Sequence, residues 1–247
     1  FSYPKKYRCV FEGGKAVKSI VTDVAIIGAG PAGLAAAITA AENGAEVVLL
    51  EKGSATGGTG NMGLGPFGVE SRIQKEKLVG LTKEEAFRKF MDSTHWKGDA
   101  RLIKKYIYMS GDTIDWLQDM GVEFHDVARY FPGSEQTWHI VKPPSGKPGP
   151  RSASEMYRIM TERAEDMGVK IMLETPAKSL IKEDGKVAGV VALDNSGDTV
   201  EVRAKAVIIA TGGYGNNAEM IQKYLGYEQG RDLFSFRIPG ITGDGIR

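Results

Sequence analysis

Short apolar runs and a stretch of helical spacing alternate in the N-terminal part of the chain. Apolar residues fill positions 24–27 and 47–50, and an alanine-rich stretch with helical spacing lies between the two runs. Short continuous apolar runs are typical of strands buried on both faces, as in a parallel sheet. The pattern therefore predicts a strand, a helix and a second strand within residues 21–53.

The central part of the chain has helical spacing. Thr82 and Glu85 are spaced as a capping box, which predicts the start of a helix, and Asp99 is expected to cap a second one. The apolar residues of this second helix are expected to face the core: Leu102, Ile103, Tyr106, Ile107, Ile114, Leu117 and Met120. Gly121 is expected to end it, and a further helix is predicted over residues 152–167.

Strand patterns return in the last third of the chain. A strand is predicted over residues 169–174, and a separate apolar strand over residues 206–210. Hairpin-type turn residues divide the sequence between these two strands. A meander of three short strands is therefore predicted at residues 177–181, 187–193 and 199–202.

Three other segments have turn-forming compositions. Residues 1–20 are expected to form an arm or hairpin that turns at Gly13-Gly14. Residues 57–68 contain six glycines between apolar side chains, which favours a bare backbone against a flat ligand over a flexible linker. Residues 129–151 are rich in proline and glycine and are expected to lack regular structure, as a long functional or disordered loop.

The segment between the first strand and helix carries a phosphate-binding pattern. Gly28, Gly30 and Gly33 permit a tight turn, close approach of the backbone to phosphate, and close helix–strand packing. Helix N-termini favour anions, because their N–H groups are unpaired and the helix dipole is positive there. Glu51 ends the second strand, where a carboxylate can accept hydrogen bonds from ribose hydroxyls. The unit therefore predicts binding of a dinucleotide, either NAD or FAD.

Composition disfavours several classes of function. The net charge of +1 gives no indication of a nucleic-acid partner, and no apolar run has the length of a membrane span. Cys9 is the single cysteine, so this chain alone forms no internal disulfide and no multi-cysteine metal site. No Ser/His/Asp set and no paired-histidine spacing occurs, and no metal ligand is assigned. The chain starts at Phe1 without a signal peptide, so we expect a cytoplasmic location, or a periplasmic one if a signal was removed.

Several further motifs follow the dinucleotide unit in a defined order. They are Gly57-Gly58-Thr59, Ile114-Asp115-Trp116-Leu117, Ala210-Thr211-Gly212-Gly213 and Gly240-Ile241-Thr242-Gly243-Asp244-Gly245. With residues 23–52, this order resembles the fumarate reductase/succinate dehydrogenase flavoprotein superfamily. Its soluble branch includes flavocytochrome c fumarate reductases, urocanate reductases and ketosteroid dehydrogenases. The resemblance covers about residues 21–247.

The resemblance implies an α/β fold and a set of FAD-binding residues. The fold is expected to be a Rossmann-like FAD-binding domain over residues 21–247, with a parallel sheet, a β-meander and a helical insertion at about 75–167, behind an N-terminal arm at residues 1–20. The residues expected to bind FAD are Gly28, Gly30, Ala32, Gly33, Glu51, Lys52, Gly58, Thr59, Gly60, Leu64, Gly65, Ala177, Thr211, Gly212, Gly213 and Asp244. The glycines near residue 30 are expected on the pyrophosphate, Glu51 on the ribose, and Thr59 to Gly65 along the ribityl chain and flavin edge.

Three departures from the family pattern modify these expectations. Residues 57–70 contain no histidine for a covalent flavin link, so FAD is expected to be non-covalent. Gly65-Pro66-Phe67-Gly68 replaces the usual Gly-Gly-Met-Asn-like run, and Pro66 removes an N–H group, which disfavours fumarate as the substrate. The family's substrate histidines and proton-donating arginine lie beyond the Gly243-Asp244-Gly245 motif. The capping domain and the catalytic half are therefore expected to lie outside this chain.

The favoured interpretation is an FAD-dependent oxidoreductase with a small-molecule substrate. It would move a hydride between flavin N5 and an activated C=C bond of an unsaturated carboxylate or an enone. The sequence defines neither this substrate nor the electron donor. Two alternatives remain: a non-catalytic cofactor-binding module and an NAD-dependent dehydrogenase. No catalytic residue is assigned, although His139, placed in the Pro/Gly-rich loop, is favoured over His95 and His125 to approach a substrate.

Overall fold

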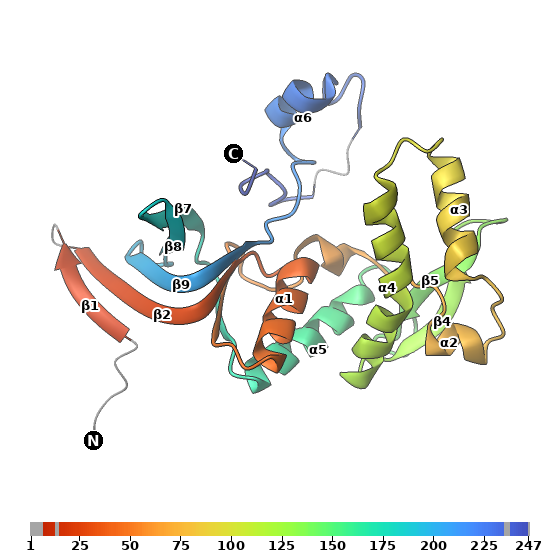
Figure 1. Cartoon of the computed structure of the whole chain (residues 1–247), viewed down its shortest axis with the longest axis horizontal. Helices are drawn as coiled ribbons and strands as arrows, with labels where there is room; N and C mark the ends of the chain where they lie inside the picture. Colours follow the sequence, from red (N-terminus) through yellow and green to blue (C-terminus); the bar gives the residue numbers. More distant parts are fainter. Residues whose placement is uncertain (1–6, 13–14, 235–237, 247) are drawn as a thin grey trace. The chain divides into compact units, whose positions relative to one another are not determined.

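The chain folds into two compact units. The computed structural model describes residues 7–12, 15–234 and 238–246 (Figure 1). Unit 1 combines Phe1–Gly60 with Met160–Arg247, and unit 2 comprises Asn61–Ile159. The predicted turn at Gly13-Gly14 lies outside the described residues.

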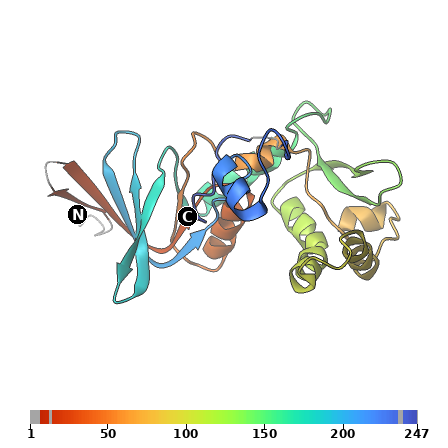
Figure 2. The same cartoon turned by 90° about the horizontal axis from the view of Figure 1, so that it is seen from above.

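Unit 1 contains a large mixed sheet with the strand order β6-β3-β2-β9-β8-β7, and β1 pairs with β2 beside this path. The strands are β1 (Tyr7–Glu12), β2 (Lys15–Ile27), β3 (Val47–Leu50), β6 (Lys170–Met172), β7 (Ala177–Glu183), β8 (Lys186–Leu193) and β9 (Thr199–Ile209). Strands β6, β3, β2 and β9 pair in parallel, whereas β7, β8 and β9 form an antiparallel meander, visible side by side in Figure 2. The predicted parallel sheet, meander and N-terminal hairpin are confirmed.

Helix α1 (Pro31–Glu42) connects β2 to β3 and covers the parallel part of the sheet. Proline at the first helical position suits a helix start, because its missing N–H would have no intrahelical partner there. Leu34, Ala37 and Ile38 of α1 are fully buried, as are Ala25 and Ile26 of β2. These apolar contacts place the glycine-rich turn between β2 and α1 at the carboxyl end of the parallel strands, where open α/β sheets bind ligands.

Unit 1 also contains α6 (Ala218–Leu225), which follows the meander. The side chain of Asn217 accepts a hydrogen bond from the N–H of Met220 at the start of this helix. Gly226 ends it in the left-handed conformation, with φ of 75°. Met220 and Ile221 are buried, so one face of α6 packs against unit 1.

Unit 2 combines helices with a small two-stranded sheet. Its elements include α2 (Arg72–Glu76), α3 (Lys83–Ser93), α4 (Ala100–Asp119), β4 (Phe124–Arg129) and β5 (Gln136–Val141). The 3₁₀ turn η1 (Gly58–Met62) and helix α5 (Ala153–Asp166) run across the boundaries of the two units. The predicted caps are confirmed: Thr82 and Glu85 form a capping box, and Asp99 accepts from two N–H groups of α4. Within the described residues, no helix combines the length and apolar character that crossing a membrane requires.

Two predictions about strands are wrong. Residues 129–151 are not without regular structure, because β5 lies inside this segment. It pairs with neighbouring β4 and also forms hydrogen bonds with residues 64–68, a contact between distant segments that composition does not reveal. The separate strands predicted at 199–202 and 206–210 are one strand, β9. Polar residues between them are tolerated because β2 pairs with β9 along almost its whole length.

The prediction that every apolar position of α4 faces the core is also wrong. Ile107, Ile114 and Leu117 are buried, but Leu102 is 68% and Tyr106 55% exposed. These two residues belong to a face of α4 that the described part of unit 2 leaves largely uncovered. Tyr106 nevertheless stacks on Phe67, with 5.4 Å between the ring centroids.

Candidate cofactor-binding site

The turn between β2 and α1 is built for close backbone contact. Gly28 has φ of +99°, and a Cβ atom there would lie 2.7 Å from the carbonyl oxygen of Ala210. A Cβ on Gly33 would lie only 1.8 Å from the carbonyl oxygen of Gly28. Gly30 differs, because a Cβ there would meet no atom within 4 Å. Gly30 is also the N-cap of α1 and provides no side-chain cap, so this helix start, with Ala32 in its first turn, suits an anion.

Glu51, at the end of β3, connects the adjoining turns. Its Oε2 atom accepts a hydrogen bond of 2.7 Å from the N–H of Ala29, and its Oε1 atom accepts one of 2.7 Å from the N–H of Gly53. An ionised carboxylate has about four acceptor positions, so Glu51 retains capacity for ribose hydroxyls. The contact with Ala29 was not anticipated from the sequence, although both residues lie within the motif.

We expect Glu51→Gln to weaken both the fold and dinucleotide binding. One carboxylate oxygen becomes an NH₂ group that faces a backbone N–H, so about 1–3 kcal/mol of unfolding free energy should be lost. Affinity for ADP should fall about tenfold, since the amide has only one acceptor oxygen. Urea unfolding and calorimetric titration with ADP measure the two effects. Glu42→Gln, at an exposed position of α1, is the matched control; equal effects of both variants would contradict this role of Glu51.

The first part of the glycine-rich loop lies beside the turn that follows β2. The N–H of Gly57 donates to the carbonyl oxygen of Ala29 over 2.7 Å. Gly57 and Gly58 both have positive φ, and a Cβ on Gly58 would lie 3.3 Å from the Cα of Gly30. Thr59 and Gly60 continue the loop within η1. The sequence singled out Gly58, Thr59 and Gly60, but Gly57 makes the contact that attaches the loop.

The end of β9 and the C-terminal segment meet near Lys52. The Nζ atom of Lys52 lies 2.5 Å from Oδ2 of Asp244 and 3.1 Å from Oγ1 of Thr242. The N–H of Gly243 donates to the carbonyl oxygen of Gly213, over 3.1 Å. Two further predicted positions belong to the same end of β9: Thr211, whose hydroxyl accepts from the N–H of Gly245, and Gly212, with φ of 74°. Segments distant in sequence thus meet beside the end of β3.

Ala177 begins β7, close to the same strand end. The N–H of Thr175 donates to the carbonyl oxygen of Glu51 over 2.8 Å, so the segment before Ala177 is attached where β3 ends. Leu64 and Gly65 instead belong to unit 2. The carbonyl oxygen of Leu64 accepts from the N–H of Val141, and a Cβ on Gly65 would lie 1.8 Å from the carbonyl oxygen of His139. Gly65 is therefore required by packing against β5.

The histidines are placed differently from expectation. His139 lies in β5 and is fully buried, so the prediction that it lies in a loop is wrong. Burial lowers its pKa from 6.5 to about 4, while the Thr137 carbonyl and Asp115 act in the opposite direction. His95 and His125 are exposed. Among the described residues, no three His, Cys, Asp or Glu side chains gather as a metal site would require.

Comparison with known proteins identifies the family. Residues 23–247 match the family described as FAD binding domain. The chain belongs to this family. The predicted superfamily and its Rossmann-like fold are thereby confirmed, and FAD is favoured over NAD as the dinucleotide.

Relatives of this FAD-binding domain include two bacterial reductases. Vinyl phenol reductase of Lactiplantibacillus plantarum is 35% identical over 227 residues, which are 91% of this chain and 44% of that protein. Urocanate reductase of Eggerthella lenta is 33% identical over 90% of this chain and 36% of that protein. The FAD-binding domain therefore spans less than half the length of these relatives.

Solved structures agree with this assignment. An open conformation of a flavocytochrome c3 fumarate reductase superposes with a TM-score of 0.79 and 28% identity, over 92% of this chain and 39% of that one. The 3-ketosteroid-Δ4-(5α)-dehydrogenase of Rhodococcus jostii, solved with 4-androstene-3,17-dione, superposes with a TM-score of 0.76 and 25% identity, over 92% and 52% of the two chains.

Proposed function

We propose that this FAD-binding domain belongs to an oxidoreductase that moves a hydride to or from an activated C=C bond. The observation that carries the proposal is the convergence of Gly30, Glu51 and Asp244 segments at the carboxyl end of the parallel strands. The names of the relatives point the same way, since they are reductases of urocanate, vinyl phenols and fumarate. FAD, when bound, supplies hydride transfer at its N5 atom.

The residues of unit 1 fit the ADP half of FAD. The start of α1, with Gly28, Gly30, Ala32 and Gly33, provides backbone donors and an open approach for the pyrophosphate. Glu51 would accept the ribose hydroxyls, and Ala177 would lie at the adenine. Gly58, Thr59, Gly60, Thr211, Gly212 and Gly213 would flank the phosphates and ribityl chain. The absence of histidine in residues 57–70 supports a non-covalent complex.

Lys52 and Asp244 have a specific place in this proposal. Both side chains are partly exposed, at 38% and 45%, so their ion pair is open to exchange with a ligand. Asp244 would accept a hydrogen bond from a hydroxyl of the ribityl chain, and Lys52 would then face the phosphates. Leu64 and Gly65 are proposed to contact the flavin edge. Residues 21–247 would act as one domain with a helical insertion, behind the arm at residues 1–20.

The nature of the substrate is the finer part of the proposal. Pro66 has no backbone N–H group that could donate a hydrogen bond to a substrate. This favours a substrate less polar than fumarate, such as an enone or a vinyl phenol. The electron donor and the location, cytoplasmic or periplasmic, are properties of the full-length protein. A second candidate is that residues 1–247 bind FAD but turn over no substrate alone, which the length of the relatives favours.

Titration of the 247-residue chain with FAD and NAD tests the cofactor assignment. We expect FAD to bind at least about tenfold more tightly than NAD. The activity is tested in the full-length protein, by adding fumarate, an enone or a vinyl phenol to the chemically reduced flavoprotein and recording flavin reoxidation under anaerobic conditions. Equal affinity for NAD, or no reoxidation by any of these acceptors, would contradict the proposal. Turnover by residues 1–247 alone would exclude the non-catalytic candidate.

A further inference from the structure

A buried polar network joins β5 to the start of α2. Nε2 of His139 lies 2.7 Å from Oγ of Ser71, and both side chains are fully buried. Ser71 is the N-cap of α2 and forms a capping box with Gln74. The amide of Gln74 then donates to the carbonyl oxygen of Gln136 over 2.7 Å. The Ser71–His139 contact and the hydrogen bonds of the Gln74 side chain to backbone groups thus connect α2 to β5 in the core of unit 2.

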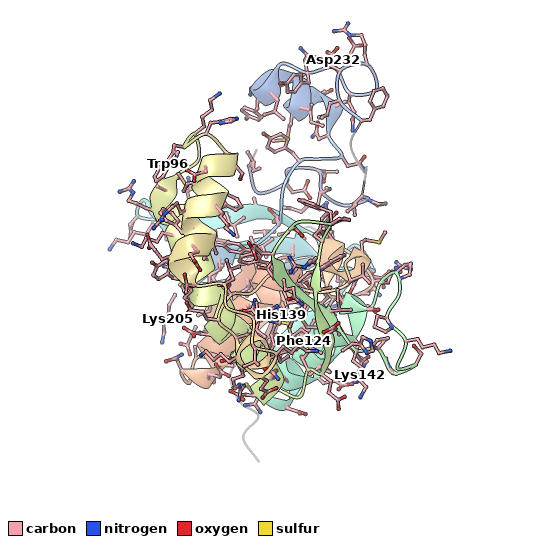
Figure 3. All side chains as sticks on the ribbon, turned by 90° about the vertical axis from the view of Figure 1, so that its right-hand side faces the viewer. Trp96, Phe124, His139, Lys142, Lys205 and Asp232 are labelled. Atoms are coloured by element: carbon pink, nitrogen blue, oxygen red, sulfur yellow. The ribbon has the colours of Figure 1, made fainter. Side chains whose placement is uncertain are left out.

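The network defines the protonation state of the histidine. Nδ1 of His139 lies 3.2 Å from the carbonyl oxygen of Thr137, an acceptor only, so Nδ1 carries the proton. Nε2 therefore accepts the hydrogen bond from the Ser71 hydroxyl, and the ring is neutral. Phe124 of β4 lies edge-on against it, with 5.7 Å between ring centroids (Figure 3). The charged group that faces it from α4 is Asp115, which is paired with Arg72.

The second part of the glycine-rich loop lies directly on this network. Residues 64–68 run along β5, with hydrogen bonds of 2.9 Å from His139 N–H to Pro66 oxygen and from Gly68 N–H to Thr137 oxygen. A Cβ on Gly68 would lie 2.8 Å from Cε1 of His139. Val69 donates to Ser110 of α4 over 3.0 Å. The loop is therefore held between β5 and α4, and the imidazole fills the space beneath Gly68.

We propose that Ser71 and His139 are positioning residues for the flavin: their hydrogen bond fixes residues 64–68, whose backbone then contacts the isoalloxazine edge. This inference rests on the proposed function, because it requires Leu64 and Gly65 to contact the flavin. Neither Ser71 nor His139 touches the cofactor. Each acts through the loop that lies over the imidazole.

The test compares binding of FAD and of ADP to the 247-residue chain. ADP lacks the flavin and reports on the pyrophosphate site alone. We expect His139→Leu to reduce FAD affinity about tenfold, change ADP affinity less than about twofold, and blur the resolved shoulder of the bound flavin spectrum. Ser71→Ala should act in the same direction. His139→Gln keeps an acceptor for the Ser71 hydroxyl and should restore both the affinity and the spectrum. His125→Gln, at an exposed position, is the matched control.

Each outcome decides between the two levels of inference. Binding of neither FAD nor ADP by the wild-type chain would refute the proposed function and this inference with it. Binding of both by the wild type, with FAD affinity and spectrum unchanged in His139→Leu, would refute the positioning role alone. Equal losses of FAD and ADP affinity in His139→Leu would also refute it, because they indicate general destabilisation. A selective loss of FAD affinity without rescue by His139→Gln would refute the hydrogen bond as its cause.

Discussion

Gly33→Ala is expected to destabilise unit 1 by at least ~3 kcal/mol, which is near or beyond the usual limit for overpacking. The added Cβ would lie 1.8 Å from the carbonyl oxygen of Gly28, and backbone atoms cannot yield as a flexible side chain does. The strand and helix would have to separate, and α1 buries Leu34 and Ile38 against the sheet. Urea unfolding followed by far-UV circular dichroism measures the loss.

Gly30→Ala is the matched control. It is expected to leave the stability of unit 1 nearly unchanged and to weaken FAD binding instead. Gly30 has φ of −75°, and its Cβ would meet no protein atom within 4 Å. Its unfolding free energy should therefore change by less than ~1 kcal/mol, the ordinary cost of alanine at an N-cap. Affinity for FAD should fall at least about tenfold, because the methyl group occupies the approach of the pyrophosphate. Unchanged FAD affinity in Gly30→Ala would show that the phosphates bind elsewhere.

Acidification is expected to destabilise unit 2 through His139. The pKa of this buried imidazole is lowered from 6.5 to about 4. An unfolded chain takes up a proton as the pH falls below 6.5, whereas the folded chain does so only near pH 4. The contribution of neutral His139 to the unfolding free energy is therefore fully present above pH 6.5. It is lost as the pH falls from 6.5 to about 4. The loss amounts to roughly 3 kcal/mol.

The measurement is urea unfolding between about pH 7.5 and pH 4, with wild type and His139→Gln compared at each pH. Glutamine does not titrate, so the difference between the two proteins isolates the histidine from carboxylates such as Asp126 and Glu155, whose pKa values are lowered by Lys77 and Arg158. Parallel curves for wild type and His139→Gln would show that His139 is protonated equally in the folded and unfolded states.

Local patterns in the sequence were sufficient for much of unit 1. The apolar runs at β2 and β3, the glycines between them and the turns of the meander act over short distances, so their structures follow from nearby residues. The caps of α3 and α4 were predicted for the same reason. The position of Glu51 at the end of β3 also followed from the run before it.

Pairing between distant segments explains what local patterns missed. Strand β5 lies in a Pro/Gly-rich stretch and pairs with neighbouring β4, and residues 64–68, which are distant in sequence, run along it. Strand β9 continues through polar positions because β2 supports it. Gly65 was interpreted only as a ligand contact, whereas in the folded chain the backbone of β5 leaves no space for a side chain there.

The sequence by itself determined the family, the FAD-binding motif and the positions of most strands along the chain, because these depend on short motifs, their order and the spacing of nearby residues. Only the tertiary structure decided that Lys52 pairs with Asp244 and that the N–H of Ala29 donates to Glu51. It also decided that buried His139 forms a hydrogen bond with Ser71. These contacts join residues far apart in the chain, and their geometry depends on how the sheet and helices pack. Spacing along a sequence contains no such distances.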